Sequence, residues 1–329
     1  MIVAVTGGTG FIGKRLLAHH VNRGDTVRVL SRGQPTASAP GIRTFTGDLA
    51  LPSVSLREFV EGADIVYHCA AELRDEKKMH DTNLRGTENL LAAAQGNVGR
   101  WVQLSSTGVY GRRARNGQDT QTSFEVTEET TVHPENAYEI SKEAADRQVV
   151  DFAGRHNLSC VIVRPSNVYG TDMSNQSLFQ LIRMIDRGMF FFIGSKGNAK
   201  DAVANYVHVD NVVDALAHCG TANLPGNAKA YIVSDFRRLR DFVGIISGAL
   251  EKAPPRVTVP ESLARLAALL GGIVPGFPLT ASRIDALTDP TIYRTGRIET
   301  ELGFKNRTSM ENGIAELVHQ WRTGLSRGE

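Results

Sequence analysis

Residues 6–13 read TGGTGFIG and follow directly on 2–5, a short run rich in β-branched residues. The next segment, 14–23, has the spacing of apolar side chains that a helix requires. We therefore expect a strand, a glycine turn and a helix. In such a unit Gly7 permits the tight turn, Gly10 lets main-chain N–H groups approach a pyrophosphate, and Gly13 allows close packing of helix on strand. A tight turn without any ligand is the alternative.

The alternation of strands and helices continues through the first half of the chain. Strand-like runs recur at 26–30, 42–45, 64–69, 101–104 and 159–163, and a helix is predicted at 138–155. This order is typical of an α/β protein with a doubly wound parallel sheet, the Rossmann arrangement. We expect residues 1–170 to form the dinucleotide-binding domain and 171–329 a smaller C-terminal substrate-binding lobe, with segments exchanged across the boundary.

Two segments do not fit this alternation. The polar stretch 111–135 predicts an exposed loop or lid. The apolar stretch 263–274 is shorter than the roughly 20 residues of a membrane span, so we expect a core helix, with contact to a membrane surface as the alternative.

Composition argues against several classes of function. The 329 residues include 37 basic and 35 acidic side chains, net charge +2, without a basic run that could follow a phosphate backbone. Nucleic acid is therefore not an expected partner. Cys69, Cys160 and Cys219 lack the spacing of a disulfide framework or a metal site, and the N-terminus lacks the features of an export signal. We expect a cytoplasmic protein without a bound metal and without a membrane span.

The end of the second predicted strand bears on the choice of cofactor. Ser31 and Arg32 stand where an acidic residue would bind the ribose of NAD. Because a guanidinium pairs with phosphate, we expect NADP(H) to be favoured over NAD(H), with a solvated surface arginine as the alternative. Asp48, past the third strand, is expected to face the adenine amino group or to cap the next helix, and both could hold.

A candidate catalytic pair lies on the helix predicted at 138–155. Tyr138 and Lys142 are one turn apart and share a face of that helix. A nearby ammonium lowers the pKa of a phenol, so Tyr138 could exchange a proton with a substrate hydroxyl or carbonyl. Such a pair is often only a surface pair. The segment 105–111, SSTGVYG, follows a strand at the carboxyl edge where such sheets bind ligands, although a capped turn would look the same.

Together these stretches resemble the extended short-chain dehydrogenases, and most of all their branch of nucleotide-sugar epimerases, dehydratases and reductases. The resemblance covers nearly the whole chain. Besides the segments above, it is carried by Asp48-Leu49, 68–71 (HCAA), Asn83, 164–170 (RPSNVYG) and 206–215 (YVHVDNVVDA).

The resemblance implies roles for individual residues. Ser106, Tyr138 and Lys142 would be catalytic, with Ser106 bonded to the reacting oxygen. Asn83 would support the active-site helix, or be a buried amide cap. Substrate would contact Ser106, Asn167 and Asn175, although Asn167 could instead be a turn residue. The cofactor would lie against Gly7, Gly10, Phe11, Ile12, Gly13, Ser31, Arg32, Asp48, Leu49, Ala70, Ala71, Ser105, Tyr138, Lys142 and Pro165.

The sequence departs from the branch at two places. Dehydratases carry an Asp-Glu pair where this chain has Thr107 and Gly108, so dehydration is disfavoured. Many epimerases grip the diphosphate with an arginine where this chain has Ala204, which leaves Lys196, Lys200 or Arg183 as other sources of charge. His208 is expected to be structural rather than a general acid.

The resulting hypothesis is hydride exchange at a secondary alcohol or ketone of a nucleoside-diphosphate sugar, at C4, by a homodimeric 4-epimerase or 4-ketoreductase. One alternative is a ketoreductase similar to 3-beta-hydroxysteroid dehydrogenase or dihydroflavonol reductase. The other is a catalytically inert dinucleotide-sensing module.

Overall fold

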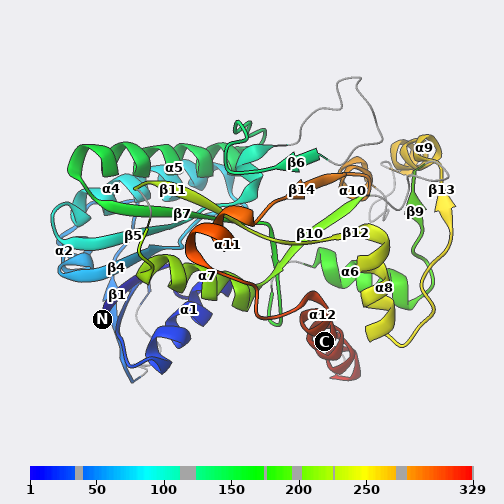
Figure 1. Ribbon diagram of the computed structural model, residues 1–329, viewed down its shortest axis with the longest axis horizontal. Helices are drawn as coiled ribbons and strands as arrows, with labels where there is room; N and C mark the ends of the chain where they lie inside the picture. The colour runs from blue at the N-terminus through cyan, green and yellow to red at the C-terminus, as the bar shows by residue number, and fades with distance from the viewer. Residues whose placement is uncertain are drawn as a thin grey trace.

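The computed structural model describes residues 1–33, 40–111, 124–173, 176–194, 202–224, 227–271 and 280–327. The chain forms a larger lobe around one long sheet and a smaller lobe of short sheets and helices (Figure 1). In the long sheet the strands run in the order β3-β2-β1-β4-β5-β7-β11, and every neighbouring pair is parallel. These strands are β1 Ile2–Thr6, β2 Thr26–Ser31, β3 Ile42–Thr46, β4 Ala63–His68, β5 Val98–Leu104, β7 Ser159–Pro165 and β11 Lys229–Val233.

Helices cover both faces of this sheet, which confirms the doubly wound fold. One face carries α1 Phe11–Asn22, α7 Val209–Thr221 and α11 Gly296–Leu302, and the other α2 Val54–Val60, α4 Gly86–Ala94 and α5 Ala137–His156. Val3 and Val5 pack toward the first face and Ala4 toward the second, all fully buried. This double burial explains why β1 reads as a continuous apolar run. The short α3 Glu76–Met79 leads into a π-helical turn, His80–Arg85, before α4.

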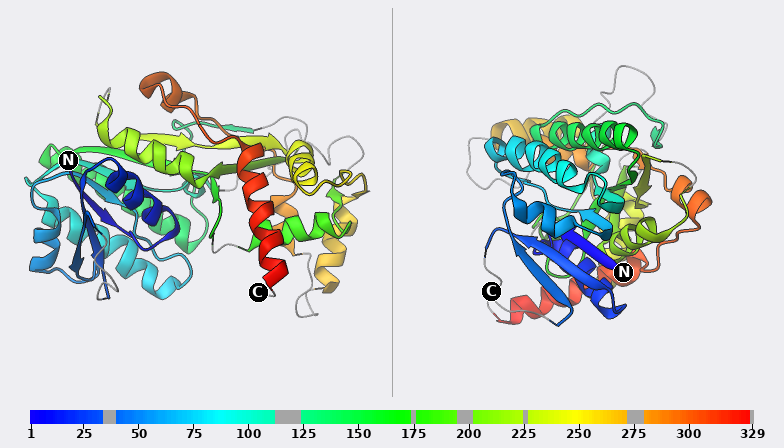
Figure 2. Two further views of the ribbon diagram at one scale, coloured as in Figure 1. Left: turned by 90° about the horizontal axis from the view of Figure 1, so that it is seen from below. Right: turned by 90° about the vertical axis from the view of Figure 1, so that its left-hand side faces the viewer.

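The smaller lobe is built on three short sheets. The first contains β8 Asn167–Tyr169, β10 Val203–His208 and β12 Asp235–Arg238. In the second, β6 Phe124–Val126 pairs with β14 Thr291–Tyr293. In the third, β9 Phe192–Ile193 pairs with β13 Thr258–Val259. Its helices are α6 Ser177–Asp186, α8 Leu239–Ala249, α9 Glu261–Gly271, α10 Ala281–Ala286 and α12 Met310–Arg327. Helix α12, drawn in red, lies where the two lobes meet (Figure 2).

The division of the chain near residue 170 stays a prediction, but segments beyond it do return to the large lobe. Helix α7 packs on the long sheet, and β11 is its edge strand beside β7. The stretch 111–135 is not wholly loop, because β6 forms a strand there and buries Val126 at 3% exposure. Residues 112–123 lie outside the described part of the chain.

The interpretation of 263–274 as a core helix is wrong for one face of α9. Leu263, Leu266 and Leu269 are 56%, 52% and 74% exposed, while Ala264 is buried. The apolar residues occur on both sides of this helix, and the lobe covers only one of them. Within the described residues no helix is long and apolar enough to cross a membrane.

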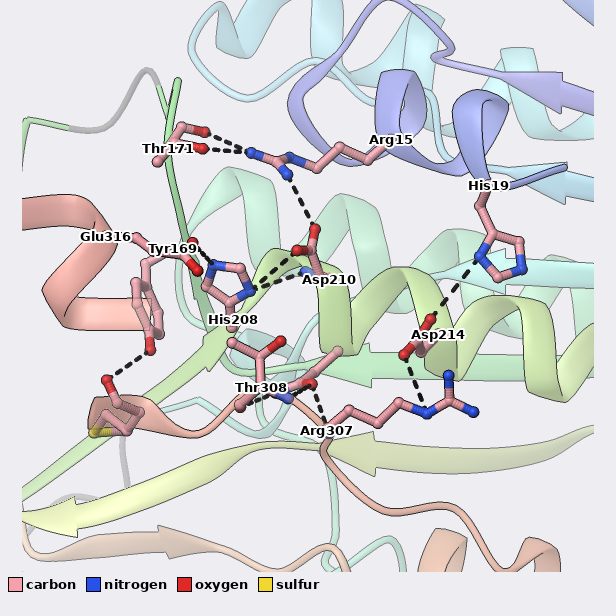
Figure 3. Close-up of polar contacts among 12 residues, drawn as sticks. Arg15, His19, Tyr169, Thr171, His208, Asp210, Asp214, Arg307, Thr308 and Glu316 are labelled. Carbon is pink, nitrogen blue, oxygen red and sulfur yellow. Dashed lines mark hydrogen bonds and ion pairs between the residues drawn. The ribbon is translucent and has the colours of Figure 1, made fainter. Parts of the chain in front are cut away.

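A cluster of polar contacts joins the lobes beside α1 (Figure 3). Arg15 donates to Asp210 at 3.0 Å and to the hydroxyl of Thr171 at 2.7 Å. His208 is 2% exposed, caps α7 by accepting from the N–H of Asp210, and has Nε2 3.9 Å from a carboxylate oxygen of Glu316 on α12. These contacts agree with the structural role expected for His208.

Candidate active site

A cavity of about 840 Å³ opens at the carboxyl ends of the central strands of the long sheet. All the residues predicted to bind cofactor or substrate that the structure describes line this cavity, whereas Asn175 lies outside the described residues. Its wall is formed by Thr6, Gly7, Thr9, Gly10, Phe11, Ile12, Gly13, Leu30, Ser31, Arg32, Gly33, Gly47, Asp48, Leu49, Cys69, Ala70, Ala71, Glu72, Leu73, Thr82, Leu104, Ser105, Ser106, Tyr138, Lys142, Pro165, Ser166, Asn167, Val168 and Met173.

The glycine turn between β1 and α1 has no room for a side chain at Gly7 or Gly13. Gly7 has φ +69°, and a Cβ there would lie 2.7 Å from the main-chain nitrogen of Ala70. A Cβ at Gly13 would lie 2.1 Å from the carbonyl oxygen of Gly7, so that only glycine fits. Gly10 caps α1 without a side-chain hydrogen bond, which leaves the N–H groups of the first turn to another acceptor. This cradle fits the pyrophosphate of a dinucleotide.

Ser31, Arg32 and Asp48, which were predicted to face the ribose and adenine of the cofactor, all line the cavity. Arg32 is exposed, and the hydroxyl of Ser31 accepts from the N–H of Gly33 at 3.3 Å. The helix-cap alternative for Asp48 is wrong, because the N-cap residue of α2 is Ser53. The carboxylate of Asp48 instead accepts from the N–H of Ala50 at 3.0 Å, in the cavity wall.

Tyr138, Lys142 and Ser106 all line the same cavity. Helix α5 starts immediately before the tyrosine because the side chain of Asn136 caps it, accepting from the N–H of Glu139. The side chain of Ser106 lies close enough to the Tyr138 hydroxyl to oppose the rise in its pKa. Ser106 also begins the 3₁₀ turn Thr107–Tyr110 and accepts from the N–H of Gly108 at 3.0 Å. The segment 105–111 is therefore a capped turn, and the same turn places Ser106 in the cavity with Tyr138.

The expected effect of Lys142 on Tyr138 is wrong for this structure. Desolvation and, to a smaller degree, the charge of Asp146 raise the pKa of Tyr138 to about 12, and the nearby Ser106 side chain only partly opposes them. The Lys142 ammonium donates to the main-chain oxygen of Leu104. Burial lowers the pKa of Lys142, against the attraction of Asp146. At neutral pH Tyr138 therefore keeps its proton.

Asp146, which the sequence motifs did not single out, lies behind the cavity wall and contacts Ser105. Its Oδ2 accepts from the hydroxyl of Ser105 at 2.7 Å and from the guanidinium of Arg164 at 3.1 Å, and Asp146 and Arg164 are 3% and 8% exposed. Arg164 also donates to the hydroxyl of Tyr110 at 3.0 Å. The available signal was the position of Asp146, one turn after Lys142 on the same face of α5.

The two asparagines implied by the resemblance lie at different parts of the site. Asn83 donates to the hydroxyl of Ser141 on α5 at 2.9 Å and so does contact the active-site helix. Asn167 belongs to strand β8, so the turn alternative is wrong, and its amide donates to the carbonyl of Asn205 at 3.1 Å. Ala204 packs inside the apolar core of the smaller lobe. Within the described residues no group of three or more His, Cys, Asp or Glu side chains could hold a metal ion.

Comparison with protein families adds to this geometry. The model of the NAD dependent epimerase/dehydratase family matches residues 3–233. The chain belongs to this family. It is therefore an NAD(P)-dependent enzyme of the extended short-chain dehydrogenase type, as the sequence motifs indicate.

The names of the proteins similar to this chain refer to different substrates. UDP-glucose 4-epimerase of Vibrio cholerae is 25% identical over 99% of this chain and 97% of its own. 2-Alkyl-3-oxoalkanoate reductase of Stenotrophomonas maltophilia is 28% identical over 96% of this chain and 98% of its own. The structure of UDP-glucuronic acid 4-epimerase from Bacillus cereus in complex with NAD superimposes with a TM-score of 0.73 at 16% identity, covering 98% of this chain and 99% of that one.

Proposed function

We propose that this family member transfers hydride at a secondary alcohol or ketone, with Tyr138 exchanging the proton. The observation that supports it is the placement of Tyr138 beside Ser106, in the wall of the cavity that also contains the glycine turn. A substrate oxygen bound between these two hydroxyls would lie within reach of both. Tyr138 would donate its proton as a ketone is reduced and recover it as an alcohol is oxidised.

The other residues hold and orient the reactants. Gly7, Gly10 and Gly13 would hold the dinucleotide, which supplies or accepts the hydride when bound. Lys142, fixed on Leu104, would place its ammonium beside the nicotinamide ribose. Purified protein, assayed with NADPH and NADH against a panel of ketones, tests the proposal. Turnover by the wild type and its loss in Tyr138→Phe would support it, and no turnover across nucleotide sugars, steroids and oxoalkanoates would refute it.

For the substrate we propose a nucleoside-diphosphate sugar, reacting at C4 by epimerisation or ketoreduction. Supporting observations are the exposure of Asn167 toward the cavity and the likeness to UDP-glucose 4-epimerase over nearly the whole chain. Binding of uridine diphosphate, measured by calorimetry with and without bound dinucleotide, tests this assignment. Absence of measurable uridine diphosphate binding would refute this assignment.

The second candidate is a ketoreductase acting on a substrate without a diphosphate. Ala204 favours it, because this position faces an apolar core rather than an anion. Turnover of a steroid or oxoalkanoate ketone, together with indifference to uridine diphosphate, would select it. An inert dinucleotide-sensing module would instead bind NADPH and turn over neither kind of substrate.

For the cofactor we propose NADP(H) over NAD(H), supported by the exposed Arg32 in the wall of the cavity. Denaturing the purified protein and identifying the released nucleotide tests this first. Tightly held NAD would favour an epimerase that recycles its own hydride, and would refute the interpretation of Arg32. An empty site that takes up NADPH would favour a ketoreductase. The homodimer likewise stays a proposal that sedimentation measurements test.

A further inference from the structure

A line of buried hydrogen bonds leaves the glycine turn and runs through the interior of the large lobe. Thr6, the last residue of β1, has its hydroxyl 2.7 Å from Nδ1 of His68 at the end of β4. Nε2 of His68 is 3.0 Å from the hydroxyl of Thr87 on α4. The exposed fractions of Thr6, His68 and Thr87 are 0%, 1% and 1%. Neither His68 nor Thr87 lines the cavity.

The same line continues to the catalytic helix. The Thr87 hydroxyl donates to the main-chain oxygen of Asn83 at 2.6 Å. The Asn83 amide donates to the hydroxyl of Ser141 at 2.9 Å, and Ser141 donates to the main-chain oxygen of Tyr138 at 2.8 Å. Thus five side chains, all buried, connect the phosphate-binding turn to the catalytic tyrosine.

The direction of each bond follows from the hydrogens available. The N–H of Ala70 donates to the hydroxyl of Thr6 at 3.2 Å, so the hydroxyl hydrogen of Thr6 is free for Nδ1 of His68. Thr87 uses its one hydrogen on Asn83 and must accept from His68. His68 is therefore neutral with its proton on Nε2. Burial lowers its pKa to about 3, and the charge of Lys142 acts in the same sense.

We propose that His68 and Thr87 are positioning residues, which hold the tyrosine helix in register with the dinucleotide-binding turn. This inference rests on the proposed function, because it concerns the same cavity. Every donor in the line has an acceptor, and a displacement at either end leaves a buried polar group unpaired. The main chain at Ala70 also touches the turn itself, at the point where a Cβ on Gly7 would collide. Dinucleotide binding at the turn is therefore transmitted to Tyr138.

Two substitutions at Thr87 separate the hydrogen bond from packing. Thr87→Val keeps the shape of the side chain and removes the hydroxyl, whereas Thr87→Ser keeps the hydroxyl and removes the methyl group. Hydrogen exchange, followed by mass spectrometry with and without NADPH, needs no substrate. In the wild type and Thr87→Ser we expect NADPH to slow exchange at residues 6–13 and at 143–153, the part of α5 beyond the residues placed against the cofactor. In Thr87→Val we expect slowing at 6–13 and at the directly contacted 137–142, but not at 143–153.

Kinetics give a second readout. Because a misplacement of about 1 Å costs roughly 10²-fold in rate, kcat of Thr87→Val should fall by about that factor, with KM changed little and with recovery in Thr87→Ser. Protection at 143–153 that persists in Thr87→Val would overturn the proposal. Should that variant unfold, Ser141→Ala decides the question at the far end of the line, where the same selective loss is expected and retained protection overturns it. A protein without turnover on any ketone would refute the proposed function and leave the exchange result intact.

Discussion

Lys142 donates its ammonium hydrogen to the main-chain oxygen of Leu104, and this bond anchors it at the carboxyl end of β5. The ammonium lies one helical turn from Tyr138 but does not lower the pKa of the phenol, which desolvation raises to about 12. The tyrosine therefore keeps its proton at neutral pH. In this protonation state a phenol can donate a proton, as the proposed reduction of a ketone requires.

The pH dependence of the two directions should differ accordingly. A raised pKa means that the donor form of Tyr138 persists up to about pH 12. We expect kcat/KM for ketone reduction to stay level through neutral pH and to decline only in strong alkali, while alcohol oxidation rises as pH approaches 12. Initial rates over the range in which the protein stays folded measure both, since kcat/KM reports groups of the free enzyme. A fall in kcat/KM for ketone reduction with a midpoint near pH 7 would contradict the raised pKa of Tyr138.

Removing the Tyr138 hydroxyl should cost catalysis and little binding. We expect Tyr138→Phe to lower kcat by about 10²–10⁴-fold, the usual worth of a positioned proton donor. Its dinucleotide Kd, measured by NADPH fluorescence, should change by less than about threefold, because the ring still fills the same wall. Tyr231→Phe is the matched control, since that hydroxyl bonds Glu301 at 2.8 Å in another part of the molecule. Equal losses in both variants would argue for a general structural effect.

Arg32 should decide between the two dinucleotides. Arg32→Asp removes a cation that can pair with a 2′-phosphate and adds a carboxylate that can bind a 2′-hydroxyl. We expect the ratio of NADP to NAD affinity to fall by about 10–100-fold, measured by titration of both reduced cofactors. The control is Arg57→Asp, which makes the same change in net charge. Arg57 is an exposed residue of α2 and does not line the cavity. An unchanged ratio in Arg32→Asp, or an equal shift in Arg57→Asp, would remove the support for NADP(H).

The parts of the fold that the sequence predicted are those with a local cause. Strand β1 reads as apolar because both of its faces are buried, and Gly13 is required by its contact with the main chain of Gly7, six residues before it. Tyr138 and Lys142 share a helix face by simple periodicity. Such features are encoded over short stretches, and the structure brings them together at one cavity.

What the sequence could not predict depends on contacts between distant segments. The high pKa of Tyr138 arises from desolvation by the assembled cavity wall. Strand β6 exists because residues 124–126 pair with 291–293, a register that no local pattern encodes. Both sides of α9 carry apolar side chains, leucines on the exposed side and Ala264 on the buried one, so that apolar character alone did not tell them apart. The partner of Asp146 was equally hidden, since Arg164 lies on another element.

The buried pair of Asp146 and Arg164 gives the last prediction. Asp146→Asn would leave the guanidinium of Arg164 buried at 8% exposure without a counter-charge. Breaking a buried pair in this way costs about 3–5 kcal/mol in the free energy of unfolding. We expect urea denaturation to show a loss of this size for the single variant. Glu143→Gln, which breaks a surface pair with Arg147, should cost less than about 1 kcal/mol.

The double variant Asp146→Asn with Arg164→Met tests whether the charge is the cause. Methionine removes the unpaired cation and fills similar apolar space, so stability should recover in part. The recovery stays incomplete because the hydroxyl of Tyr110 loses the donor of its 3.0 Å hydrogen bond and Ser105 loses a charged acceptor. The double-mutant cycle should therefore give a coupling of at least about 1 kcal/mol. Losses that simply add would show that the pair acts through packing rather than through its charges.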